Sequence, residues 1–166
     1  MSTRCNIIIE HGSTRLYVYR HWDGYPSCTG ADLLEKLQAA RGPETAHYGR
    51  FTSSRFITAL LTDMDEPTVY RKARPHYETT TEVHGDIDYL YRIRFDNDRA
   101  PTIGVLDLTF SGGNSERRGK VDASDVNLTT PAGFTAFVNQ EIRDANARMQ
   151  AYYAKQNQPW EPQAEL

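Results

Sequence analysis

The chain has 166 residues, 39% of them hydrophobic and 25% charged, which is enough for one globular domain with its own core. Its formal net charge of −3 lacks the basic excess of a general nucleic-acid binder, so we expect no direct DNA or RNA binding. It has no apolar run of membrane-spanning length and no signal-peptide pattern at its start, which predicts a cytoplasmic protein without a membrane partner.

The first half of the chain predicts a β-hairpin followed by two helices. Cys5 to Glu10 and Thr14 to Arg20 are predicted to be strands, and the short link between them contains a glycine. A first helix follows a capping residue at Thr29 and stops at a Gly-Pro pair. A second helix begins near Thr52 or Ser53 and ends at the latest before the proline of a Glu-Pro pair.

The second half predicts three strands and a long helix. The strands are Thr79 to Val83, Asp88 to Phe95 and Thr102 to Phe110, with a His-Gly-Asp turn between the first two. The second of them alternates, which places Tyr89, Tyr91, Ile93 and Phe95 on one face. Residues 111–127 are rich in Gly, Ser and Asn, which is typical of a mobile or irregular loop. Thr130 followed by proline is a strong start signal for the last helix.

This order of elements, β-β-α-α-β-β-β-α, predicts an α+β fold. Strands joined by turns favour an antiparallel sheet of about five strands with helices packed on one face. Residues 1–157 are predicted to form this single domain, and residues 158–166 a frayed tail. Within that tail Trp160 is expected to dock on its own domain or on a neighbouring subunit. We expect a homo-oligomer with the last helix as its interface.

The most informative residues follow the second strand, where rings and charges stand side by side: Arg20, His21, Trp22, Asp23 and Tyr25. Rings stack on flat ligands, a guanidinium binds phosphate through two parallel hydrogen bonds, and a carboxylate accepts from a hydroxyl or amino group. A structural interpretation has equal weight: Asp23 bonds the amides of a turn, the rings cap the core, and Arg20 makes a surface ion pair.

A second polar cluster contains His84 and Asp86 in the His-Gly-Asp turn. These types bind divalent metals or act as acid and base on a phosphate ester. A polar β-turn is favoured, because a metal needs more ligands than this motif supplies. Only convergence with His21 and Asp23 would reverse that preference.

Among the arginines, Arg20 and Arg92 are our candidates for phosphate binding, because each lies on a predicted strand that would fix its position. The sequence contains no phosphate-loop or nucleophile-elbow motif. Cys5 and Cys28 are predicted to be two reduced thiols. Cys5 has no activating neighbour, and Cys28, which lies just before a helix, could be acidified but is favoured as a small buried residue. We therefore assign no catalytic residue, no metal ligand and no cofactor, and the sequence favours a binding protein over an enzyme.

Three stretches carry a resemblance to known proteins: Ser2 to Ile8, Tyr19 to Pro26 and Thr79 to Tyr91. They resemble a group of small phage and prophage proteins over the first two thirds of the chain. In size and layout these are similar to phage anti-defence sponges, such as the anti-Thoeris sponge family. The resemblance implies capture of cyclic ADP-ribose-type or cyclic oligonucleotide messengers without cleavage, usually by an oligomer in the host cytoplasm. It matches no ligand residue position by position.

Three functional hypotheses follow. The first is a phage-type protein that sequesters a nucleotide-derived immune signal, with Arg20 and Arg92 on phosphates and Trp22 and Tyr25 stacked on a base. Four polar residues would then contact the ribose or the base edges: His21, Asp23, His84 and Asp86. The second is a small metal-dependent nucleotide phosphodiesterase that uses those four. The third is a protein-binding inhibitor of a host defence complex, of the anti-CRISPR or anti-restriction type, anchored by exposed aromatic residues.

Overall fold

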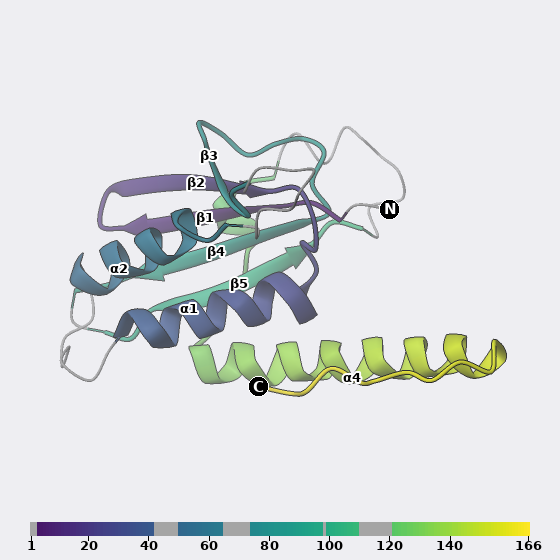
Figure 1. Ribbon diagram of the computed structural model, residues 1–166. Helices are drawn as coiled ribbons and strands as arrows, with labels where there is room; N and C mark the ends of the chain where they lie inside the picture. Colours follow the sequence, from purple (N-terminus) through teal and green to yellow (C-terminus); the bar gives the residue numbers. More distant parts are fainter. Residues whose placement is uncertain (1–2, 42–49, 65–73, 98, 110–120) are drawn as a thin grey trace.

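A five-stranded mixed β-sheet forms the centre of the fold (Figure 1). The computed structural model describes residues 3–41, 50–64, 74–97, 99–109 and 121–166. Across the sheet the strands lie in the order β3-β2-β1-β4-β5. Their bounds are Cys5–His11 for β1, Thr14–Arg20 for β2, Glu78–Thr80 for β3, Tyr89–Phe95 for β4 and Thr102–Asp107 for β5.

The N-terminal hairpin is confirmed. β1 and β2 pair antiparallel, from Cys5 opposite Arg20 to His11 opposite Thr14. The turn between them contains Gly12 in the left-handed region, with φ of 59°. Glycine adopts that conformation without the steric cost that a Cβ brings, so the turn residue identified in the sequence closes the hairpin.

The prediction of a purely antiparallel sheet is wrong, because β1 and β4 pair in parallel. The prediction placed β3 and β4 in a hairpin around the His-Gly-Asp turn. Instead β3 pairs with the outer side of β2, and β4 lies on the other side of β1. The segment 81–88 therefore carries the chain from one side of the hairpin to the other, and such a crossover returns the next strand parallel to β1.

The described residues form three α-helices, which cover one face of the sheet as predicted (Figure 1). They are α1 (Ala31–Arg41), α2 (Arg50–Leu61) and α4 (Pro131–Lys155). The order along the chain differs from the prediction by two short additions, a π-helical turn over Pro26–Gly30 and a 3-10 turn over Ala123–Asp125. No described helix is long and apolar enough to cross a membrane.

The main core lies between the sheet and these helices. Alternate residues of each strand point into it, among them Ile7, Val18 and Ile93, and they meet Leu33 and Leu37 of α1. The period of two that predicted this face in the sequence is confirmed. Apolar burial of this kind is the main stabilising contribution to such a domain.

The opposite face of the sheet carries a second, smaller apolar cluster. Ile8, Tyr19 and Leu90 point to this side and are covered by Ile87 and Val126 from the two connecting segments. One of those segments lies within the stretch predicted to be an irregular loop, of which only residues 121–127 are described. The sheet therefore carries an apolar cluster on each of its two faces.

An ion network ties α1 to the chain that follows α2. The ammonium of Lys36 lies 2.8 Å from Asp32 and 3.0 Å from Asp63, and His76 contacts Asp63 at 3.2 Å. Burial raises the pKa of Asp63, but the hydrogen bonds from Lys36 and His76 outweigh it and hold that pKa below its ordinary value.

The segment 158–166, predicted to fray, lies along α4 in register. The contacts repeat every seven residues along the helix and every three residues along the tail. The Tyr153 ring stacks on the Trp160 ring, with 5.2 Å between their centres. Asn146 hydrogen-bonds to the backbone of Gln163, and Asn139 hydrogen-bonds to the backbone of Leu166. Seven residues of helix span about 10.5 Å and three extended residues about 10 Å, so the two repeats stay matched. Trp160 thus docks on its own chain, one of the two alternatives that the sequence left open.

Candidate functional site

Arg20, the first candidate for phosphate binding, points into the helix-covered side of the fold. Its guanidinium donates to the carbonyl of Trp22 at 2.8 Å and to the hydroxyl of Tyr77 at 2.6 Å. It lies 3.6 Å from the Asp32 carboxylate and 5.0 Å from the centre of the Tyr77 ring. The Tyr77 hydroxyl in turn donates to Asp32, and burial raises the pKa of Tyr77 well above its ordinary value. These contacts join β2, α1 and the chain before β3, which makes Arg20 part of the framework.

Arg92, the second phosphate candidate, lies on the other face of the sheet. Register pairs it with Ile8, whereas Arg20 pairs with Cys5 on the helix side. Two of its nitrogens contact Glu10, at 3.0 and 2.8 Å, and a third donates to the carbonyl of Ala123. Arg20 and Arg92 therefore do not lie at one site.

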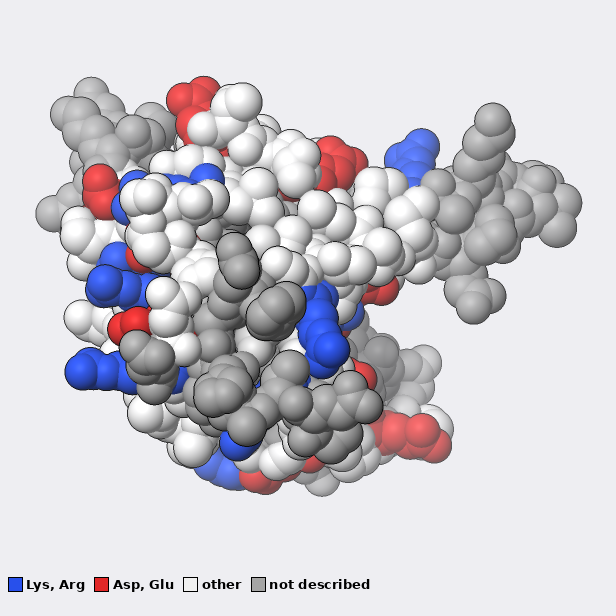
Figure 2. All heavy atoms as spheres, turned by 90° about the vertical axis from the view of Figure 1, so that its left-hand side faces the viewer, with Lys and Arg blue, Asp and Glu red and all other residues white. Residues whose placement is uncertain are grey.

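Glu10 is the centre of this second cluster, because Arg15 contacts its other oxygen at 2.7 Å. Its side chain is only 10% exposed, and both of its oxygens accept from guanidinium groups. On the face drawn in Figure 2, Lys and Arg side chains are interspersed with Asp and Glu rather than gathered into one patch. We assign Arg92 to this structural ion cluster, in which one carboxylate binds two guanidinium groups.

The two sequence motifs meet at Tyr19. The ring of His84 stacks on the Tyr19 ring at 4.3 Å, and the ring of His21 stands edge-on to it at 4.6 Å. Trp22, 45% exposed, lies 5.4 Å from His21. The backbone N–H of His84 donates to the buried Asn6 side chain, which anchors the turn to β1. We call Tyr19, His21, Trp22 and His84 the aromatic ledge.

The main contacts of the two motif carboxylates, Asp23 and Asp86, are with residues outside the aromatic ledge. Asp86 forms an ion pair with Arg4, and Asp23 accepts from the hydroxyl of Tyr25 at 3.2 Å. His84 lies 4.0 Å from Asp86, and His21 lies 3.9 Å from Glu78. Within the described ranges, no group of three or more His, Cys, Asp or Glu side chains is placed to hold a metal ion.

Tyr25 is positioned by a tight approach of the chain to the start of β1. Asp23 has φ of 55°, and Gly24 donates to the carbonyl of Thr3 while it accepts from the buried hydroxyl of Tyr91. A Cβ at Gly24 would lie 2.8 Å from the backbone of Arg4, so glycine is required there. The Asp-Gly pair noted in the sequence thus directs Tyr25 into a cleft.

This cleft has a volume of about 900 Å³ and lies between the strand ends and α4, and we call it the α4 cleft. Tyr25 and Tyr89 supply its aromatic walls, and Arg4 and Arg148 supply positive charge. Its remaining lining residues are Thr3, Ser27, Asp88, Thr109, Glu141, Ala145 and Met149. Because Arg4 also binds Asp86, the α4 cleft adjoins the turn that carries His84.

The electrostatics of the α4 cleft are mixed. Burial raises the pKa of Tyr89 to about 12, assisted by Asp107 and Glu141, and burial with the nearby Asp23 raises that of Tyr25 to about 12. Both phenols therefore stay neutral at physiological pH. Burial also raises the pKa of the Glu141 carboxyl, while Arg148 opposes that shift. Arg148 is exposed and has no hydrogen-bond or ion-pair partner among the described residues.

The two thiols are held in the protonated form. Cys5 is fully buried at the start of β1, and burial raises its pKa to about 12. Burial also raises the pKa of Cys28, in spite of the nearby Arg20 charge. Neither sulfur is a thiolate near neutral pH, and a thiolate is the reactive form.

Of the eight residues that the sequence singled out, the structure places four at or beside the aromatic ledge: His21, Trp22, His84 and Asp86. Tyr25 lines the α4 cleft, with Asp23 bonded to it. Sequence reasoning missed Arg148 and Tyr89, because their sequence patterns point only weakly to a ligand site. Arg148 is a polar residue on the exposed side of an amphipathic helix, and Tyr89 belongs to the core face of β4.

Comparison of the chain with protein-family models, with curated proteins and with solved structures finds no match in any of the three.

Proposed function

We propose that this protein binds and sequesters a nucleotide-derived anion in the α4 cleft without cleaving it. The observation that carries the proposal is the joint presence, in one cleft of about 900 Å³, of two tyrosine rings and two arginines. Clefts of this size suit small ligands, with apolar walls that give affinity and a few polar groups that fix orientation.

The parts of such a ligand find matching groups in the α4 cleft. Arg148 offers a guanidinium without a described partner, which suits a phosphate through paired hydrogen bonds. The neutral rings of Tyr25 and Tyr89 suit the face of a base. Asp88 and Glu141 add acceptors of the kind that ribose hydroxyls and exocyclic amines require.

The neighbouring aromatic ledge supports a ligand longer than one nucleotide. The exposed Trp22 and the partly exposed ring of His84 offer further ring faces near the Arg4–Asp86 ion pair. A cyclic dinucleotide has two bases for such an arrangement, and a cyclic ADP-ribose isomer has one base with two riboses and a diphosphate. The phage anti-defence role implied by the sequence resemblance is the specific form of this proposal.

Binding without turnover is favoured over catalysis by the state of the reactive groups. Burial keeps both thiols protonated, and two of the four polar residues considered for a phosphodiesterase are engaged by other side chains: Asp86 pairs with Arg4, and Asp23 accepts from Tyr25. Sequestration requires affinity and needs no activated nucleophile.

The test is capture and release. Purified protein is incubated with a panel of cyclic dinucleotides, cyclic oligonucleotides and cyclic ADP-ribose isomers, freed of unbound compound and heat-denatured, and the supernatant is analysed by mass spectrometry. We expect one intact compound in a stoichiometric amount. Light scattering of the protein before the heating step gives the mass of the oligomer that binds the compound. A cleaved product would support the phosphodiesterase, and no compound at all would favour the protein-binding inhibitor.

A further inference from the structure

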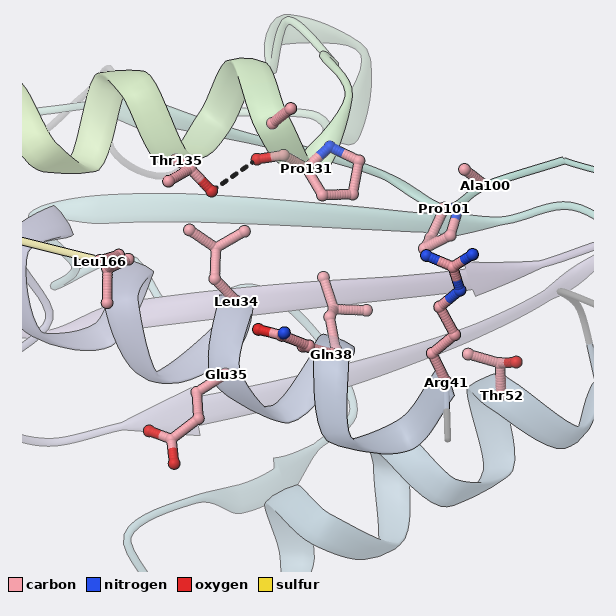
Figure 3. A pocket seen from close by; sticks show the side chains of 12 residues that line it. Leu34, Glu35, Gln38, Arg41, Thr52, Ala100, Pro101, Pro131, Thr135 and Leu166 are labelled. Atoms are coloured by element: carbon pink, nitrogen blue, oxygen red, sulfur yellow. Dashed lines mark hydrogen bonds between the residues drawn. The ribbon is translucent and has the colours of Figure 1, made fainter. Parts of the chain in front are cut away.

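A second cavity, separate from the α4 cleft, lies between α1 and the start of α4. Its volume is about 480 Å³, and Figure 3 shows that its lining side chains come from α1, α2, α4, the chain before β5 and the tail segment. Leu34 and Leu37 come from α1, Pro131 opens α4, and Pro101 closes the far side. We call it the α1 cavity.

The lining of the α1 cavity is mainly aliphatic. The hydroxyl of Thr135 donates to the carbonyl of Pro131 at 2.9 Å and so is occupied within α4 (Figure 3). Leu166 of the tail segment stands at one end of the cavity, where its backbone is fixed by Asn139. An accessible hollow of this size with mainly apolar walls is of the kind that holds small ligands.

Charge at the α1 cavity is concentrated at the end opposite Leu166. The guanidinium of Arg41, the last residue of α1, lies beside Pro101 and Ala100 (Figure 3). The Glu35 carboxylate is directed away from the other lining side chains in the same view. An elongated apolar space with a single cation at one end is complementary to an aliphatic chain that ends in an anionic group.

We propose that the α1 cavity is a binding site for an aliphatic monocarboxylate, with the chain along Leu34 and Leu37 and the carboxylate at Arg41. The site shares no lining residue with the α4 cleft, so the proposal is independent of the nucleotide-binding function. A medium-chain acid fits the volume, and a nucleotide does not suit the aliphatic walls.

The affinity should follow chain length. Burial of one methylene strengthens association by roughly threefold when area removal is converted to a binding constant. Calorimetric titrations of the whole protein with octanoate, decanoate and dodecanoate, below their micelle concentrations, should give one site whose affinity rises by about this factor per methylene. The rise should stop once the cavity is full.

Three variants locate the site. Arg41→Gln should weaken dodecanoate binding about fivefold, as for an ion pair at a cavity rim, and leave dodecanol binding unchanged. Ala132→Phe fills the cavity from the first turn of α4 and should abolish binding of both. The matched control, Ala147→Phe, adds the same ring at an exposed α4 position that does not line the cavity and should bind as the wild type does.

Equal binding by the Ala132→Phe and Ala147→Phe variants, or no saturable binding at all, would overturn the proposal. Equal affinity for dodecanol and dodecanoate, with no effect of Arg41→Gln, would overturn the assignment of a carboxylate. Methyl NMR of the unaltered protein guards against a folding defect in the variants. Dodecanoate should shift the resonances of Leu34 and Leu37, and shifts confined to other leucines would contradict the site.

Discussion

Replacement of Arg20 by alanine separates a framework role from a ligand role. The guanidinium donates to the carbonyl of Trp22 and to the hydroxyl of Tyr77, and its side chain is 11% exposed. Removal of one partner from a buried ion pair costs about 3–5 kcal/mol. Here Asp32 keeps its contact with Lys36 at 2.8 Å, so we expect a smaller loss, about 2–4 kcal/mol.

The assay is unfolding in urea, with thermal unfolding as a second measure. For a domain of this size each kcal/mol lowers the midpoint by about 2–4 °C, so Arg20→Ala should melt roughly 4–16 °C lower. The matched control is Arg94→Ala, an exposed β4 arginine with no hydrogen-bond or ion-pair partner in the described part of the chain, expected within about 0.5 kcal/mol of wild type.

A double-mutant cycle isolates the contact with Tyr77. Arg20→Ala and Tyr77→Phe should be coupled by about 1–2 kcal/mol, because both remove the same hydrogen bond. The reasoning would be refuted if Arg20→Ala unfolded at the wild-type midpoint, above all if it had also lost ligand capture, since Arg20 would then belong to the ligand site.

Three further predictions concern the tail, acid stability and the thiols. Trp160→Ala removes a stacked aromatic pair and should lower the free energy of unfolding by about 1 kcal/mol, and an unchanged urea midpoint would mean that the tail contributes nothing. Because the pKa of Asp63 is held low in the folded state, its stabilising contribution is full above pH 5 and is lost as pH falls through that lowered pKa. Asp63→Asn should therefore unfold more easily than wild type at pH 6 and no more easily at pH 2.5, and an equal deficit at both pH values would remove Asp63 from the ion network. Cys28 should react with a disulfide reagent at pH 8 before Cys5 does. The full burial of Cys5 and its pKa of about 12 should delay its reaction until the protein unfolds. Simultaneous reaction of both thiols in the native state would contradict the burial of Cys5.

The local elements of the fold follow from the sequence because their signals are local. The glycine turn predicts the hairpin, the Thr-Pro pair predicts the start of α4, and the alternation in β4 predicts which of its residues reach the core. The N-cap of α4 is formed as expected, since the Thr130 side chain accepts from the N–H of Gly133. Each of these features depends on neighbours within a few residues.

The parallel pairing of β1 with β4 was beyond that reasoning. Its cause is the crossing segment 81–88, which Asn6 anchors through His84 and which buries Ile87. These are contacts between residues about eighty positions apart, and a His-Gly-Asp sequence is equally compatible with a hairpin turn. The sheet order depended on a tertiary contact that no periodicity encodes.

The candidate site was predictable in part for the same reason. The ring-rich stretch after β2 drew attention to Trp22 and Tyr25, both of which are exposed. Arg20 looked equally suitable, because a strand arginine beside rings has the same pattern whether it binds phosphate or Asp32. The two roles are distinguished only by the face of the sheet to which the Arg20 side chain points. Arg20 points to the face on which α1 packs, and there it lies beside Asp32.

The measurement that tests the central claim most directly is the affinity of the captured nucleotide for two variants of α4. Arg148→Ala removes one of the two cations of the α4 cleft, and Lys155→Ala removes a cation from the end of the same helix, which does not line the cleft. Isothermal titration should show the affinity reduced at least tenfold by Arg148→Ala, as for a charge-assisted phosphate contact, and unchanged by Lys155→Ala. Equal affinities for the two variants would contradict binding in the α4 cleft.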